Sequence, residues 1–133
     1  MKNFTTPTLL ISGLMYLGFG IIFIINPSFL ENAYIFSNHP TGLMEIRAFY
    51  GGLEIGLGLI LLYSIKTDRS LQKAALCLLS SILFFTILGR VIGVFLDGIE
   101  GYYLWIALII EIPILIASIL ATKSTKLEIE QTL

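Results

Sequence analysis

Four long apolar runs, separated by short polar segments, constrain this chain more than any other feature of its sequence. A helix needs about 20 predominantly apolar residues to cross the ~30 Å hydrocarbon core of a bilayer. The runs lie at about residues 8–25, 45–65, 71–96 and 102–121. Only 13% of the residues are charged, whereas a soluble domain carries about 25%. The sequence therefore predicts an all-α fold, an integral membrane four-helix bundle.

The 133 residues leave no room for a second domain beside four spans, so we expect a single transmembrane domain over residues 1–133. Residues 26–44 form the longest connection and mix aromatic with turn residues. That mixture suits a short helix or lid at the membrane interface, where aromatic rings settle. Residues 122–133 are polar and are expected to fray or to form a short surface helix.

Basic residues near the span ends predict the orientation. In an up-down arrangement they all fall on one side of the membrane, and the opposite loops, 26–44 and 97–101, contain no lysine or arginine. The residues on the basic side are Lys2, Lys66, Arg69, Lys73, Lys123 and Lys126. We therefore expect up-down topology with both termini cytoplasmic.

The second run carries two charges, Arg47 and Glu54, among its apolar residues. A charge at the centre of a membrane helix costs about 2.5–3.5 kcal/mol on insertion scales, so it is rarely left facing lipid. A spacing of seven residues places both charges on one helix face. Tyr50, Gly51 and Gly58 fall on or beside this face, and the two glycines are candidates for leaving space for a ligand.

The third run carries Arg90 and the fourth carries Glu111. Together with Arg47 and Glu54 they give two positive and two negative formal charges, so the sum is zero. At 1.5 Å rise per residue, both glutamates lie near the middle of the bilayer core. We expect Arg90 to pair with Glu54 or Glu111, and Arg47 to lie at the mouth of a pocket. The four charges could serve only to fix how the helices are aligned with one another. This structural role alone is a weak explanation for two buried ion pairs, because desolvation offsets their attraction. Intramembrane charges more often mark a site.

Glycine spacing predicts where helices approach closely. Gly13 and Gly20 lie two turns apart in the first run and share one face. GxxxG spacings occur at Gly52/Gly56 and at Gly89/Gly93. The first of these points away from Glu54 and could serve association with another helix.

Several chemistries are excluded. The sequence has no GxxxxGK[ST] loop, no HExxH and no histidine or cysteine cluster, so we expect no metal and no cofactor. The formal net charge of -1 argues against a nucleic-acid partner. His39, the sole histidine, is expected to be solvated, and Cys77, the sole cysteine, to be a small buried hydrophobe.

The strings E-I-R-A-F-Y-G-G-L-E-I-G-L-G (45–58) and L-G-R-V-I-G-V-F-L-D-G (88–98), with a mid-span glutamate at 111, resemble the DUF4345 family of small four-helix bacterial membrane proteins. Residues 51–62 also resemble the wider DoxX-like group. The resemblance implies a four-helix bundle in a bacterial cell membrane, and for some DoxX-like relatives a role beside quinone-linked oxidoreductases. It implies no catalytic residues.

We interpret the charged residues of the apolar runs as the lining of a pocket that opens toward the outer leaflet. This pocket would bind a small amphipathic or anionic ligand such as a lipid or quinone head group. Its expected residues are Arg47, Tyr50, Glu54, Arg90 and Glu111. A small proton-coupled transporter is an alternative, in which the glutamates exchange protons and a dimer provides alternating access. An accessory or chaperone-like subunit of a larger membrane complex is another. Enzymatic activity stays open, with an isomerase using a glutamate as acid and base as the conceivable case.

Overall fold

The structure, a computed structural model, describes residues 4–130, with side chains as far as Thr125. No strand occurs in this part of the chain, and the predicted all-α fold is confirmed. The elements are α1 (Thr5–Ile25), η1 (Pro27–Ala33), α2 (Pro40–Ile46), η2 (Arg47–Gly52), α3 (Leu53–Ser64), α4 (Arg69–Asp97) and α5 (Tyr103–Glu130). η1 is a 3-10 helix. η2 is a π-helix that joins α2 to α3 without a break.

Four helices are long and apolar enough to cross a membrane: Thr5–Ile25, Pro40–Ser64, Arg69–Asp97 and Tyr103–Thr125. In an apolar stretch of 18 residues within each helix, only 17% to 33% of the residues are buried inside the chain. Large side chains such as Phe95 and Leu96 are 85% and 77% exposed. Cys77, expected to be buried, is also exposed. Apolar surface on this scale is rare in soluble monomers, so the fold fits a multi-pass membrane protein.

Two helices extend well beyond their predicted bounds, and the other two by three residues or fewer at either end. The second span begins at Pro40 rather than near residue 45, because proline lacks an N–H and suits the first helical turn. α5 continues to Glu130 instead of ending near residue 121. Thr125 Oγ1 lies 2.9 Å from Thr5 Oγ1, a buried hydrogen bond that ties this extension to the start of α1. Lys2, residues 131–133 and the Lys126 side chain lie outside the described part.

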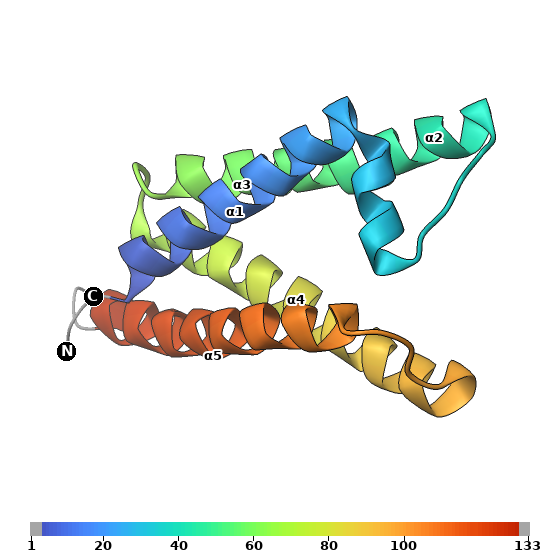
Figure 1. Ribbon diagram of the computed structural model, residues 1–133. Coiled ribbons are helices and arrows are strands. Elements are labelled where there is room, and N and C mark those ends of the chain that lie inside the picture. Colours follow the sequence, from blue (N-terminus) through green and yellow to red (C-terminus); the bar gives the residue numbers. More distant parts are fainter. Residues whose placement is uncertain (1–3, 131–133) are drawn as a thin grey trace.

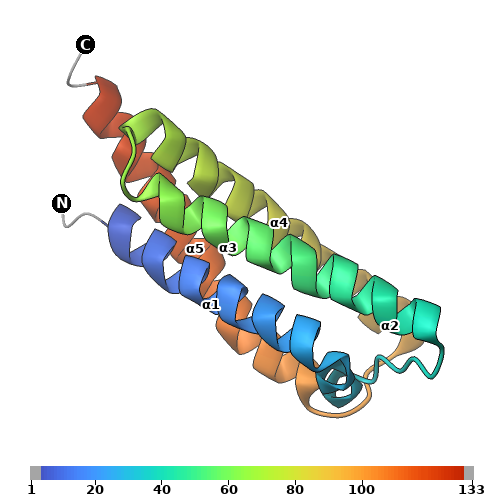
Figure 2. The same ribbon diagram turned by 90° about the horizontal axis from the view of Figure 1, so that it is seen from above.

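The helices form two pairs. α1 packs along η2 and α3, and α4 packs along α5. The pairs converge where α1 begins and α5 ends, and they diverge at the other end (Figure 1). Seen from above, the helices run side by side along a common direction (Figure 2). We call the end with Thr5 and Thr125 the closed end, and the end with η1 the open end.

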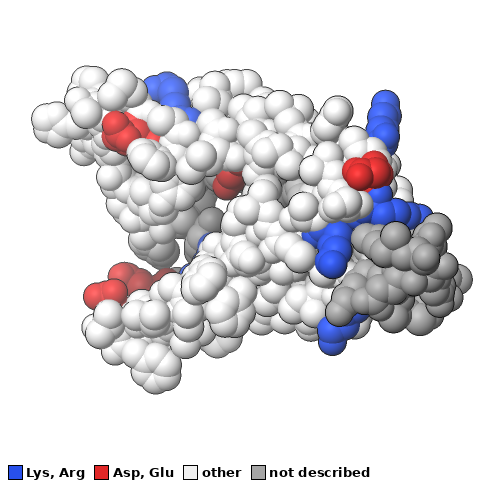
Figure 3. Space-filling view, turned by 180° about the vertical axis from the view of Figure 1, so that it is seen from behind, with Lys and Arg blue, Asp and Glu red and all other residues white. Residues whose placement is uncertain are grey.

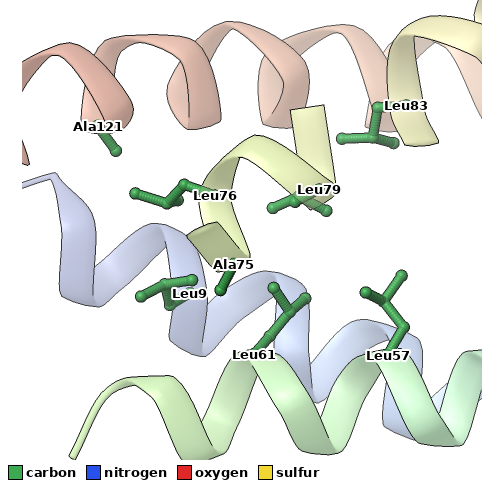
Figure 4. Packing of buried hydrophobic residues seen from close by; sticks show 8 residues of the cluster. All are labelled: Leu9, Leu57, Leu61, Ala75, Leu76, Leu79, Leu83 and Ala121. Atoms are coloured by element: carbon green, nitrogen blue, oxygen red, sulfur yellow. The ribbon is translucent and has the colours of Figure 1, made fainter. Parts of the chain in front are cut away.

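The main apolar core lies toward the closed end, where all four long helices contribute side chains (Figure 4). Its buried members are Leu9, Leu57, Leu61, Ala75, Leu76, Leu79, Leu83 and Ala121. Ser80 Oγ and Ser118 Oγ, 2.8 Å apart, link α4 to α5 in the same half. This half holds the pairs together, whereas Glu54, Arg90 and Glu111 lie beyond it, toward the open end.

Glycines allow α1 and α3 to approach backbone to backbone. A Cβ atom on Gly58 would lie 2.7 Å from the backbone nitrogen of Leu17 and 2.8 Å from the carbonyl oxygen of Gly13. Gly20 and Gly51 form a second such pair. The predicted close-approach face of Gly13 and Gly20 is thus confirmed. Gly51 and Gly58 do not leave space for a ligand, because α1 occupies it.

The two GxxxG spacings do not contribute to packing within the chain. A Cβ atom on Gly56, Gly89 or Gly93 would meet nothing within 4 Å, and one on Gly52 would meet only the carbonyl oxygen of Arg47 at 3.9 Å. These positions therefore lie on outward-facing helix surfaces.

Candidate functional site

Arg90 and Glu111 form an ion pair between α4 and α5. Arg90 Nη1 donates to Glu111 Oε1 at 2.8 Å and to Oε2 at 2.6 Å. The two side chains are only 26% and 16% exposed. Of the two partners considered for Arg90, the structure selects Glu111. The guanidinium charge is thus balanced inside its own helix pair.

Glu54 lies on the other helix pair. We call Glu54, Arg90 and Glu111 the charged cluster, and Glu54 is its member without a hydrogen-bond partner. Its Oε2 atom is buried and has no hydrogen-bond partner. Leu57, one turn further along α3, belongs to the core, so Glu54 stands at the edge of the packed half. A buried polar atom without a partner costs about 1–3 kcal/mol. In the part of the chain described, no arginine forms an ion pair with Glu54.

Arg47 turns toward α1 instead of toward Glu54. Its Nε donates to the carbonyl oxygen of Ile24 at 3.0 Å, which satisfies one of the free carbonyl groups of the last turn of α1. The π-helix explains the difference. The N–H of Leu53 bonds to the carbonyl of Ala48, five residues back. A π-helix has more residues per turn than an α-helix, so seven residues no longer make two turns. The prediction that Arg47 and Glu54 share one helix face is therefore wrong.

Two tyrosines lie close to the charges. Tyr16 of α1 and Tyr103, the first residue of α5, are half-buried, and each interacts electrostatically with Glu54, Arg90 and Glu111. Sequence reasoning identified neither tyrosine as part of the site. The sequence could have indicated Tyr16, because it is a tyrosine inside an apolar run and a buried tyrosine hydroxyl usually has a polar partner.

Tyr50 lies further toward the open end. Its ring packs edge-on against Phe23, with ring centroids 6.2 Å apart, and it interacts electrostatically with Tyr103. With Glu45, Ile46 and Phe49 it lines a shallow, mostly apolar pocket of about 340 Å³. This pocket lies on α2 and η2, away from Glu111. Tyr50 therefore belongs to the rim of the charged cluster and not to its centre.

The space between the two helix pairs is open at one end. The space-filling view shows a hollow between the pairs, with acidic side chains on both of its edges (Figure 3). Tyr16 and Tyr103 interact electrostatically with charged groups of both helix pairs. Glu54 of one pair and the Arg90–Glu111 ion pair of the other are thus linked through the same two phenol groups.

The connection between α1 and α2 crosses the open end. Phe23, Leu30 and Ile46 form a small buried cluster that holds η1 against α1. A Cβ atom on Gly101 would lie 2.7 Å from Tyr34 Oη, so this tyrosine rests on the connection between α4 and α5. η1 also contacts α5. The segment therefore bridges the two helix pairs.

The remaining candidates contribute no chemistry at this site. His39 precedes α2 and is exposed, as expected. Within the described residues, no three side chains of histidine, cysteine, aspartate or glutamate gather in a way that could hold a metal ion.

Comparison with known proteins bears on identity rather than on chemistry. No curated protein and no solved structure matches the chain. The family model described as "Domain of unknown function (DUF4345)" matches residues 4–122. That interval runs from the start of α1 into the last third of α5 and includes every charged residue of the cluster. The chain belongs to the DUF4345 family.

Proposed function

We propose that this membrane protein binds a small amphipathic molecule between its two helix pairs. The polar head group reaches Glu54, and the apolar tail lies among the side chains that line the space. One observation carries the proposal: the buried Oε2 atom of Glu54 has no partner, although Arg90 and Glu111 have each other.

A purely structural cluster would not need Glu54. Arg90 and Glu111 already balance each other, so a third charged group adds desolvation without attraction. More than about 90% of buried polar groups in folded proteins have a partner. An unsatisfied carboxyl group inside a membrane span is therefore a candidate for contact with a ligand.

The distribution of charge supports access from the outer leaflet of a bacterial cell membrane. Several lysine and arginine side chains gather at the closed end, although Arg47 and Arg90 lie nearer the open end (Figure 3), and basic residues favour the cytoplasmic side. The open end then faces outward. The segment from η1 to α2, resting on Gly101 through Tyr34, lies at the entrance as a lid.

Native mass spectrometry tests this proposal. The protein released from mild detergent should carry a discrete adduct. Glu54→Gln and Arg90→Gln should both lose it, since the first removes the carboxylate and the second disturbs the neighbouring pair. Glu100→Gln, in the exposed connection between α4 and α5, should keep it. An adduct that survives Glu54→Gln, or none in the unaltered protein, would contradict the proposal.

Proton-coupled transport is a second candidate, and the unpaired state of Glu54 favours it specifically. Glu111 is held by Arg90, so Glu54 alone would exchange a proton during a transport cycle. Transport in liposomes that persists in Glu54→Gln would eliminate this function while leaving binding to be tested separately.

A further inference from the structure

We infer that the head group taken by this site is cationic, an ammonium carried on a lipophilic chain, with its positive charge placed against Glu54. The inference rests on the proposed function and specifies the chemical class of its ligand.

Charge balance is the first argument. Glu111 already has a cationic partner in Arg90, whereas Glu54 has a buried oxygen atom without any partner. Arg47, the other intramembrane arginine, is turned to the carbonyl oxygen of Ile24. Both arginines are thus engaged elsewhere, and Glu54 has no counter-ion among the described residues. A cationic head group supplies one, whereas an anionic one would place a like charge against the carboxyl group in a medium of low dielectric.

The aromatic surroundings are the second argument. Tyr16 and Tyr103 come from different helix pairs and both interact with Glu54. Aromatic faces attract cations through their quadrupole, and the attraction is stronger when the cation is desolvated. A carboxyl group within electrostatic reach of two tyrosine side chains is thus suited to an ammonium group.

The entrance supplies the third argument. The connections at the open end, residues 26–44 and 97–101, carry Glu31, Asp97 and Glu100 but no lysine or arginine. Glu45 follows them at the rim of the shallow pocket beside Tyr50. Acidic side chains therefore stand on both edges of the hollow, with a basic side chain beside those of the upper edge (Figure 3). An excess of negative charge concentrates cations at an opening.

Three amphiphiles with the same ten-carbon chain test the head group alone: decylammonium, decanol and decanoate. Each is titrated onto the full-length protein in mild detergent, and the bound fraction is measured by native mass spectrometry. Decylammonium should saturate at one copy and bind about tenfold more tightly than the other two. Glu54→Gln should remove this preference, and Lys66→Gln, at an exposed position just after α3 and far from the entrance, should retain it. Thermal unfolding of each variant verifies that the fold is kept.

The outcomes separate this inference from the proposed function. Glu54-dependent binding that favours decanoate or decanol would overturn the cationic head group and leave the binding function standing. Equal binding of all three would do the same. No binding of any probe, together with no co-purified adduct, would overturn both. If Glu54→Gln fails to fold, Glu54→Asp retains the charge and should still prefer decylammonium to decanoate; loss of that preference contradicts the inference.

Discussion

Gly20 of α1 and Gly51 of η2 face each other at a separation that excludes any side chain between them. A Cβ atom on Gly20 would lie 2.8 Å from the carbonyl oxygen of Gly51. Gly13 and Gly58 repeat this contact two turns away. The two pairs set the distance between α1 and α3, and through it the position of Tyr16 relative to Glu54.

Gly58→Val should therefore destabilise the protein. The added side chain would meet the backbone of α1, and overpacking of this kind costs about 1–3 kcal/mol. Thermal unfolding in detergent, followed by circular dichroism, measures the loss. Gly56→Val is the matched control, because it changes the same helix by the same residue at a position with nothing within 4 Å. Equal losses in the two variants would show that the glycine contact does not determine stability.

The ion pair between Arg90 and Glu111 predicts a non-additive double variant. Arg90→Met leaves Glu111 without its cation and should cost about 1–3 kcal/mol. Combining it with Glu111→Leu removes both charges, and replacing an ion pair with apolar residues is often neutral. The double variant should thus be more stable than Arg90→Met alone in thermal unfolding. Additive losses would indicate that the two residues act independently.

Hydropathy and glycine spacing predicted much of this fold. Four span-length runs were sufficient to place four helices, because a bilayer requires all backbone groups to be paired within the segment. The seven-residue spacing of Gly13 and Gly20 identified the face that contacts α3. Both predictions depend only on the spacing of residues along a single helix, and this spacing is read directly from the sequence.

The site required information that helix periodicity does not contain. Arg47 and Glu54 were expected on one face because an α-helix was assumed throughout, and the π-helix at Arg47–Gly52 changes the rotation between them. Whether Arg90 meets Glu54 or Glu111 depends on how whole helices are turned, which short connections do not fix. Tyr16 was missed for the same reason.

Arg47→Gln should lower stability slightly and leave ligand binding intact. The variant loses the hydrogen bond from Nε to the carbonyl oxygen of Ile24, and a bond of this kind contributes about 1 kcal/mol. Because Arg47 does not contact Glu54, the affinity for decylammonium should stay within about twofold of the unaltered protein, well under 1 kcal/mol. A tenfold loss of affinity with unchanged stability would return Arg47 to the binding site.

The orientation of the chain can be tested by cysteine labelling in a Cys77→Ala background. Asn38→Cys lies in the connection before α2, and Lys66→Cys lies at the end of α3; both positions are exposed. If the basic end is cytoplasmic, a membrane-impermeant maleimide should label Asn38→Cys in intact cells and Lys66→Cys only after permeabilisation. The reverse pattern would invert the orientation, and labelling of both in intact cells would contradict the span between them.

Glu54→Leu should stabilise the protein while abolishing ligand binding. The substitution removes a buried carboxyl oxygen that has no partner, a group whose desolvation costs about 1–3 kcal/mol, and places an apolar side chain beside the Leu57 core. Functional groups are often retained at the expense of stability. Glu111→Leu is the control with the opposite sign, because it deprives Arg90 of its partner and should destabilise. Thermal unfolding and decylammonium titration measure the two effects separately. A less stable Glu54→Leu variant would mean that Glu54 makes a structural interaction of its own, and the argument for a ligand would lose its main support.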